Sequence, residues 1–176
     1  MFQDTFWQPL PPAVPYSLVS WLTDTGSLTE RLVRTGHAFS VEVLHQGLTP
    51  AQDDEADLIG VAPGEPVYTR HVALLLDGAR VVAARSITQR EATPWLDVLE
   101  RGNRSLGLTL FGENSNIIRE AMLYRELLPG HPLFTLAGEL DPTRSSRYPA
   151  RRSNFRLDGQ ALNVCEIFLP ALEAFL

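Results

Sequence analysis

The chain of 176 residues contains no lysine, and all 15 of its basic residues are arginine. Without a lysine it cannot form the Schiff base that holds pyridoxal phosphate. It also cannot contain the Gly-Lys-Ser/Thr core of a phosphate-binding P-loop. The single cysteine, Cys165, excludes an intrachain disulfide and a zinc site built from cysteines. Several large classes of cofactor-dependent enzyme are therefore excluded.

Long apolar runs are missing as well. No stretch of about 18 apolar residues is available to span a membrane. Four prolines, at positions 9, 11, 12 and 15, interrupt the apolar content of the N-terminus, which does not resemble a signal peptide. A single cysteine suits a reducing compartment. We therefore expect a cytoplasmic protein with no membrane insertion.

The net charge of −6 argues against a general nucleic-acid binder. The charge is uneven: residues 1–66 carry 2 arginines and 9 acidic residues, whereas residues 67–176 carry 13 arginines and 12 acidic residues. Any anion site is therefore expected in the second part. A chain of this length is expected to fold as one domain, residues 1–176, with a sizeable core.

Local signals predict the α+β class, built on an antiparallel sheet. Ser27 and Glu30 form a capping box at the start of a helix, and Gly36 is a natural stop. Helices are expected at 17–22, 27–36 and 92–102, a strand at 38–47, and hairpins at 67–88 and 151–171 that turn at Asp77-Gly78 and Asp158-Gly159. The remaining segments are expected to be an extended N-terminal segment (1–16) with Phe6 and Trp7 packed on the body, a surface loop (48–66), a turn or short helix (105–114), a helix or strand (115–127) and a connection (129–150).

The register of the first hairpin predicts an unusual pair. Counting outward from Asp77-Gly78 places Arg70 directly opposite Arg85 on an otherwise apolar face. Like charges in this position are unfavourable unless an anion lies between them, and arginine forks suit a carboxylate. The alternative is that each arginine is paired with an ordinary structural carboxylate.

The second hairpin places Glu166 opposite Arg151 by the same count, on an apolar strand face. A buried carboxylate is costly unless it is neutral, paired or functional, so the pair is either part of a site or a structural ion pair. Arg152, Asn154 and Arg156 alternate to the other face and are expected to be solvated. A one-residue slip at either turn would overturn both registers.

The remaining reactive side chains give no further site. His37, His45, His71 and His131 lack the spacing of metal ligands and are expected to be ordinary histidines. Cys165 lies on the strand face opposite Glu166 and is expected to serve packing. We therefore expect no metal site built from these side chains.

Four motifs in the chain resemble one known family, the chorismate pyruvate-lyases. The segment RRSNFRLDGQALNVCEIFLPA (151–171) resembles the family's last hairpin, with its R-R-S strand and its closing E-x-F-L-P. WLTDTGSLTERLVRTGHAFSVEVLHQG (21–47) resembles the N-terminal helix and strand. VYTRHVALLLDG (67–78) with AARS (83–86) resembles the family's arginine-bearing strands, and SLGLTLF (105–111) its L-G turn. The resemblance covers most of the chain, in the family's order.

The resemblance implies a cofactor-free enzyme that converts chorismate into 4-hydroxybenzoate and pyruvate, the entry step of ubiquinone synthesis. It also implies a monomer, with an antiparallel sheet of about six strands and helices on one side, and a strand at 115–127. In the family's pattern, Arg70 would grip the ring carboxylate and Glu166 would lie near the ring hydroxyl. Leu106 would contribute a backbone amide and Leu28 an apolar contact.

From these positions we expect the amides near Leu106 and Gly107 to assist Arg70, and either Arg85 or Arg151 to receive the enolpyruvyl carboxylate. The alternative is a non-catalytic effector-binding domain of the same fold, as found in bacterial transcription regulators. Such domains follow a basic helix-turn-helix domain, and only about 20 residues precede the first matched helix here.

Overall fold

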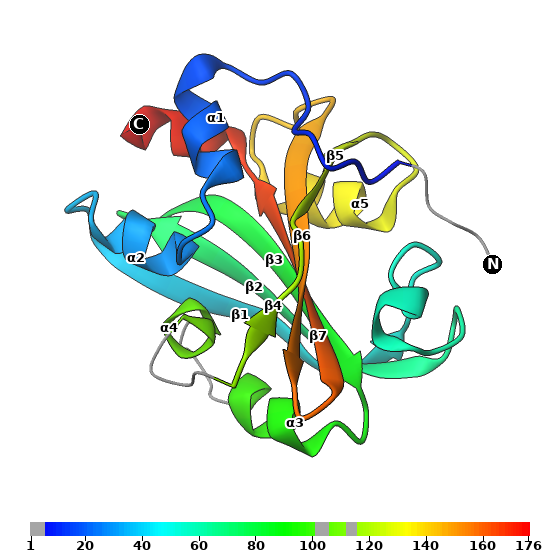
Figure 1. The fold of residues 1–176 in the computed structure, drawn as a ribbon. Coiled ribbons are helices and arrows are strands. Elements are labelled where there is room, and N and C mark those ends of the chain that lie inside the picture. The colour runs from blue at the N-terminus through cyan, green and yellow to red at the C-terminus, as the bar shows by residue number, and fades with distance from the viewer. Residues whose placement is uncertain (1–5, 101–105, 112–115) are drawn as a thin grey trace.

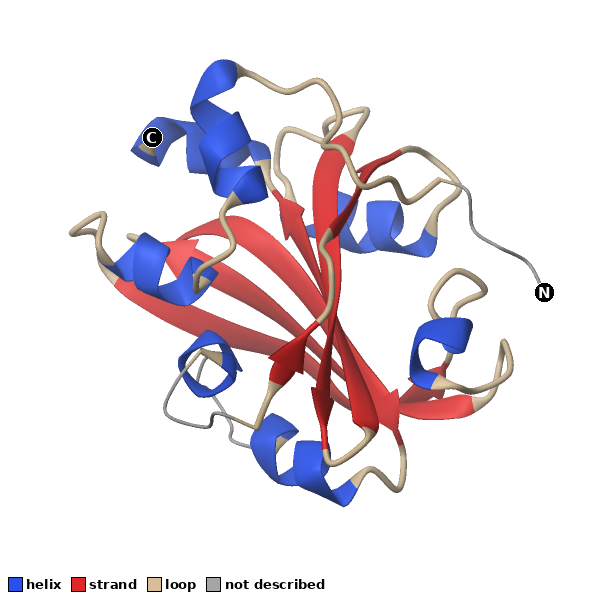
Figure 2. Ribbon diagram, viewed as in Figure 1, coloured by secondary structure: helices blue, strands red, loops and turns tan. Residues whose placement is uncertain are grey.

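The computed structural model describes residues 6–100, 106–111 and 116–176 (Figure 1). A seven-stranded antiparallel sheet forms its centre, which confirms the α+β class (Figure 2). In sheet order the strands are β1 (Phe39–Pro50), β2 (Pro66–Leu76), β3 (Ala79–Gln89), β7 (Gln160–Phe168), β6 (Tyr148–Leu157) and β4 (Ile118–Arg119), and β5 (Leu123–Leu127) also pairs with β6. The segment 115–127 therefore contains strands, as the resemblance implied.

The helices lie on both faces of the sheet. They are α1 (Tyr16–Thr23), α2 (Leu28–Val33), α3 (Thr93–Leu99), α4 (Leu106–Leu110) and α5 (Pro132–Leu140), with short 3₁₀ helices η1 (Ala56–Ile59) and η2 (Pro170–Phe175). Within the described residues, no helix combines the length and the apolar character needed to cross a membrane.

Two expectations are wrong at helix α5. The segment 129–150 is not only a connection, because it contains this helix. The helices do not all lie on one side of the sheet, because α5 lies on the face away from α1 and α2 (Figure 1). Pro132 occupies its first turn, and the His131 side chain accepts a hydrogen bond from the Leu133 amide at 3.1 Å. Leu133 and Ala137 are buried in the same apolar cluster as Ala83 on β3. The helices are thus not confined to one side.

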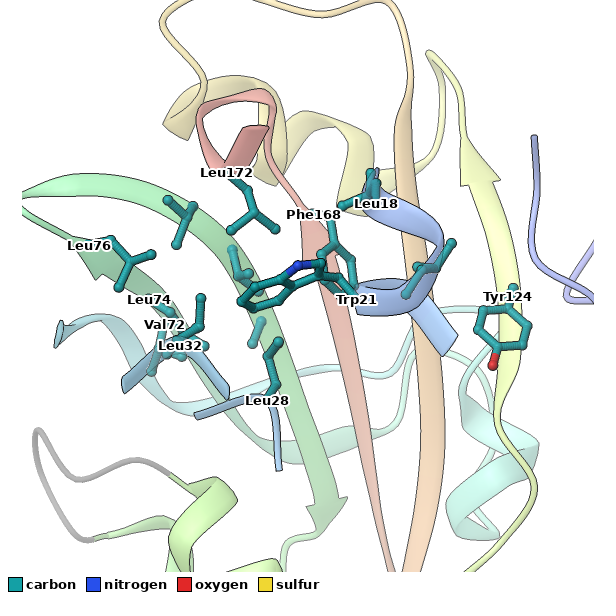
Figure 3. Close-up of a cluster of buried hydrophobic side chains, with 14 residues drawn as sticks. Leu18, Trp21, Leu28, Leu32, Val72, Leu74, Leu76, Tyr124, Phe168 and Leu172 are labelled. Carbon is teal, nitrogen blue, oxygen red and sulfur yellow. The ribbon is translucent and has the colours of Figure 1, made fainter. Parts of the chain in front are cut away.

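The other face carries the larger apolar cluster, between the sheet and α1, α2 and η2. Figure 3 shows Trp21 of α1 among Leu28, Phe168 and Leu172. Helix α2 begins as predicted, with the Ser27 hydroxyl accepting a hydrogen bond from the Glu30 amide at 3.2 Å. This packing holds the start of α2 against the sheet.

Both predicted hairpin turns are present, but the first hairpin contains a β-bulge. Asp77 and Asp158 have φ values of 47° and 50°, as type I′ turns require. In the first hairpin the register shifts between Leu74 and Leu75, so Arg70 faces Ser86 instead of Arg85. The predicted Arg70–Arg85 pair is wrong, because a one-residue bulge turns every later side chain of β3 to the other face.

The N-terminal segment packs through one of its two aromatic residues. Trp7 is buried, at 5% exposure, whereas Phe6 is 68% exposed. The Gln8 amide donates to the carbonyl of Tyr124 on β5 at 2.8 Å. Gln8 thus attaches this part of the chain to the edge of the sheet, whereas Phe6 stays outside the core, with the Arg125 guanidinium 4.9 Å from its ring centre.

Candidate active site

A cavity lies between the sheet and the helices α2 and α4, on the face opposite α5. Of the seven residues predicted for the site, six line it: Leu28, Arg70, Leu106, Gly107, Arg151 and Glu166. They come from five different elements, so only the folded chain brings them together.

Arg70 projects from the middle of β2 into this cavity and is only 2% exposed. Neighbouring apolar positions on the same strand face, Val72 and Leu74, also line the cavity. Burial lowers the pKa of Arg70, but a guanidinium stays charged at neutral pH. The cavity therefore holds a desolvated positive charge, which favours a carboxylate ligand.

Glu166 and Arg151 lie directly opposite each other on β7 and β6, as the register predicted. Arg151 Nε donates a hydrogen bond to Glu166 Oε2 at 2.6 Å. The Glu166 side chain keeps 20% of its surface exposed, whereas that of Arg151 keeps 2%. Arg151 therefore lies behind the carboxylate, which remains at the cavity wall.

Arg151 is also tied to the chain segment that ends α1. Its Nη1 donates to the carbonyl oxygens of Trp21 at 3.1 Å, Leu22 at 3.2 Å and Asp24 at 2.7 Å. The last carbonyls of a helix have no partner within the helix, and a cation there is favourable. These contacts fix Arg151, which in turn fixes the orientation of Glu166.

Leu28 and Leu106 are the first residues of α2 and α4, and both helix starts face the cavity. The two starts meet at Gly107, where an added Cβ would lie 2.7 Å from Thr29 Oγ1 and 2.9 Å from Ser27 Oγ. Only glycine permits this approach. The starts of the two helices therefore lie against each other at the wall of the cavity.

Arg119 on β4 also lines the cavity, and the sequence reasoning missed it. It lies in the segment 115–127, which local propensity alone would make a helix. The signal that could have identified it is a strand reading of this segment, which would have placed its side chains on alternating faces of the sheet. Ser86 and Ser153, which also line the cavity, were not predicted either.

Arg85 does not line the cavity, because the bulge in the first hairpin places it on the other face. Its guanidinium forms a buried ion pair with Glu55, and its Nη1 lies 2.8 Å from His71 Nε2. The alternative interpretation, in which Arg85 is paired with a structural carboxylate, is therefore correct. Arg85 cannot contact a substrate in this cavity.

The expectation that Arg152 and Asn154 are solvated is also wrong. Each is 6% exposed. Arg152 Nη1 donates to the Asp54 carbonyl at 2.7 Å and its guanidinium lies 4.2 Å from the centre of the Trp7 ring, while Asn154 donates to the Leu58 carbonyl at 2.9 Å. The N-terminal segment and the loop before β2 cover this face.

The remaining reactive groups are structural in character. Asp54 receives hydrogen bonds from Trp7 and His131, and these offset its burial and lower its pKa to about 2. Cys165 is buried on the far face, where burial raises the pKa of its thiol. Among the residues that the structure describes, no group of three or more His, Cys, Asp or Glu side chains could hold a metal ion.

Comparison with known proteins points to one family. The model of the chorismate lyase family matches residues 1–174. A probable chorismate pyruvate-lyase from Nitrosomonas europaea is 36% identical over 94% of this chain and 94% of its own length. Another, from Aromatoleum aromaticum, is 39% identical over 94% of this chain and 91% of its own length.

Solved structures show the same fold in proteins of another kind. The effector domain of PhnF from Mycobacterium smegmatis is 19% identical, with a TM-score of 0.54 over 84% of this chain and 91% of its own. A PhnF C-terminal domain is 18% identical, with a TM-score of 0.58 over 78% of this chain and 86% of its own. At such identities the likeness concerns the fold alone.

Proposed function

The chain belongs to the chorismate lyase family, and we propose that the cavity beneath α2 and α4 is where it carries out the family's reaction. In this reaction a carbon–oxygen lyase removes pyruvate from chorismate and leaves 4-hydroxybenzoate for ubiquinone synthesis. One observation carries the assignment to this cavity: it combines a buried arginine, Arg70, with the carboxylate of Glu166, which a second arginine holds in place.

Much of the driving force of the reaction comes from the substrate. Chorismate has a ring carboxylate at C1, an enolpyruvyl ether with its own carboxylate at C3, and a hydroxyl at C4. Loss of the C4 hydrogen together with the C3–oxygen bond makes the ring aromatic. The protein therefore has to bind, orient and polarise the substrate, which side chains and backbone amides can do without a cofactor.

The ring carboxylate is bound at the Arg70 end of the cavity. A guanidinium fork can bind a carboxylate through two parallel hydrogen bonds. The amides at the start of α4, near Leu106 and Gly107, add donors on the side of the helices, and Leu28 supplies an apolar contact to the ring. These groups fix the long axis of the substrate.

Glu166 acts at the other end of the ring. In this proposal it accepts a hydrogen bond from the C4 hydroxyl and acts as the base that takes the C4 proton. Arg151 is a positioning residue in this scheme, because its hydrogen bonds go to Glu166 and to the carbonyls that end α1. The arrangement needs the carboxylate to stay oriented while the ring changes shape.

The test is to mix the purified protein with chorismate, without added metal or cofactor, and to measure 4-hydroxybenzoate by chromatography and pyruvate by an enzymatic assay. Equal amounts of the two products are expected. Glu166→Gln and Arg70→Ala should each lower kcat/KM by at least about 100-fold, since each removes a charged contact to the reacting molecule. Circular dichroism should show the same fold.

Arg147→Gln is the matched control, because Arg147 is exposed and its contact with Glu126 is long, at 3.4 Å. It should keep wild-type kinetics. Near-normal rates in both Glu166→Gln and Arg70→Ala would refute the assignment of the site. Tight binding of 4-hydroxybenzoate with no turnover in the wild type would instead identify an effector-binding domain.

The oligomeric state and location are proposed with the function. We take the protein to act as a monomer in the cytoplasm, as expected for the family. A mass near 19.6 kDa in light scattering would support the monomer, and twice that mass would contradict it.

A further inference from the structure

Another arginine of the cavity, Arg119, makes only contacts with uncharged groups. Its Nε donates to Ser153 Oγ at 3.2 Å and its Nη1 to the Thr25 carbonyl at 2.6 Å. Its Nη2 lies 3.3 Å from the sulfur of Met122, which is a weak acceptor. Among the described residues, no carboxylate lies within ion-pair distance of Arg119, so its charge is not neutralised locally.

The surroundings make this charge costly. The guanidinium lies 5.2 and 5.4 Å from the ring centres of Phe111 and Phe155, which repay part of the lost hydration. Burial lowers the pKa of Arg119, and the nearby negative charge of Glu166 only partly opposes this effect. Arg119 is partly buried, and a partly desolvated cation without a carboxylate partner is favoured when an anion binds there.

The sheet places Arg119 at the far end of the cavity from Arg70. In the strand order β2–β3–β7–β6–β4, Arg70 lies on β2, Glu166 on β7 and Arg119 on β4. In chorismate the C1 carboxylate lies at one end of the ring, and the C4 hydroxyl and the C3 enolpyruvyl ether are neighbours toward the other end. The second carboxylate of the substrate would therefore reach the Arg119 end.

The two other candidates for this carboxylate are excluded by their contacts. Arg85 lies on the other face of the sheet, paired with Glu55. Arg151 uses Nε for Glu166 and Nη1 for three backbone carbonyls. Arg152 also lines the cavity, but its Nη1 donates to the Asp54 carbonyl at 2.7 Å and its guanidinium lies 4.2 Å from the centre of the Trp7 ring. Arg119 is therefore the arginine best able to receive a second carboxylate.

We propose that Arg119 binds the enolpyruvyl carboxylate of chorismate and holds this fragment while it departs. This proposal rests on the proposed function. In the step, the C4 proton leaves to Glu166 and its electron pair joins the ring. The C3–oxygen bond breaks with its electrons on the oxygen of enolpyruvate, which then takes a proton at its methylene carbon and becomes pyruvate. Arg119 contacts only the fragment that is lost.

This role separates the substrate from the product. 4-Hydroxybenzoate retains the ring carboxylate but has lost the enolpyruvyl one, so its binding should depend on Arg70 and not on Arg119. Arg119→Gln should lower kcat/KM for chorismate by roughly 10- to 100-fold, the range for one charge-assisted contact. The inhibition constant of 4-hydroxybenzoate should change by less than about threefold. Arg70→Ala should weaken both.

The experiment measures chorismate kinetics and inhibition by 4-hydroxybenzoate in the wild type, Arg119→Gln, Arg119→Lys and the control Arg147→Gln. Arg119→Lys keeps the charge but loses the fork, and should fall between the wild type and Arg119→Gln. Retained affinity for 4-hydroxybenzoate shows that the variants fold. If Arg119→Gln does not fold, the effects on kcat/KM for chorismate and on inhibition by 4-hydroxybenzoate are compared in Arg119→Lys instead.

Two results would overturn the proposal: unchanged kcat/KM in both Arg119 variants, or an equal loss of affinity for chorismate and for 4-hydroxybenzoate. The second result would mean that Arg119 supports the cavity as a whole. Failure of the proposed function would be seen separately, as a wild type that releases no pyruvate from chorismate.

Discussion

His71 should make the protein lose stability as the pH falls from 7 to 4. Its Nε2 lies 2.8 Å from Arg85 Nη1, and since the guanidinium can only donate, the imidazole must accept there and be neutral. Burial, then the charge of Arg85 and then His45, lower the pKa of His71 from 6.5 to about 4. Protonation would place two cations in contact.

The sign of the effect follows from proton binding. Between pH 6.5 and 4 the unfolded chain binds a proton at His71, whereas the folded chain does not. The free energy of unfolding should therefore fall by about 1.4 kcal/mol for each pH unit, or about 3 kcal/mol in total. Because the ring is only partly buried, solvent screening reduces this to about 2 kcal/mol. Against a typical stability of about 5–15 kcal/mol, this is a measurable loss.

The assay is urea unfolding of the wild type and of His71→Gln at pH 7.5, 6.5, 5.5 and 4.5. The glutamine carbonyl can still accept a hydrogen bond from Arg85 but does not titrate. The wild type should lose stability steadily below pH 6.5, and the difference between the two proteins isolates His71. Equal slopes in both proteins would show that His71 is not held neutral and would refute the reasoning.

Two further predictions concern packing around the site and on the opposite face. Gly107→Ala should lower kcat/KM for chorismate by at least about 10-fold with a small change in Tm, because its Cβ would lie 2.7 Å from Thr29 Oγ1 and push α4 away from α2; wild-type kinetics would contradict this close approach. Arg152→Ala should lower the free energy of unfolding by about 2–3 kcal/mol, since it removes the hydrogen bond to the Asp54 carbonyl and the stacking on Trp7. Urea unfolding measures this loss, and unchanged stability in Arg152→Ala would contradict the structural role of these contacts.

The sequence alone determined the features that short-range chemistry controls. Two Asp-Gly pairs define both hairpin turns, because the I′ conformation needs residues that tolerate positive φ. The second hairpin contains no bulge, so its turn was enough to predict the contact of Glu166 with Arg151. Ser27 likewise marks the start of α2, since its hydroxyl caps the helix.

The tertiary structure decided what depends on bulges and on long-range packing. The bulge in the first hairpin moved Arg85 to the other face, and nothing in the local sequence signals it, because bulges are set by the twist and pairing of the whole sheet. Arg152 is an outward residue by its strand register, but Trp7 and the loop around Asp54 cover it. Burial of a strand face depends on distant segments, which periodicity cannot reveal.

Dependence on long-range pairing also explains why the sequence analysis did not assign Arg119 to the site. Its segment has helical propensity, and only pairing with β6 makes it a strand that faces the cavity. The sequence thus determined the family of reactions and the pair that carries the carboxylate. The tertiary structure decided that Arg119 reaches the cavity and Arg85 does not, because that depends on which side of a twisted sheet each strand presents.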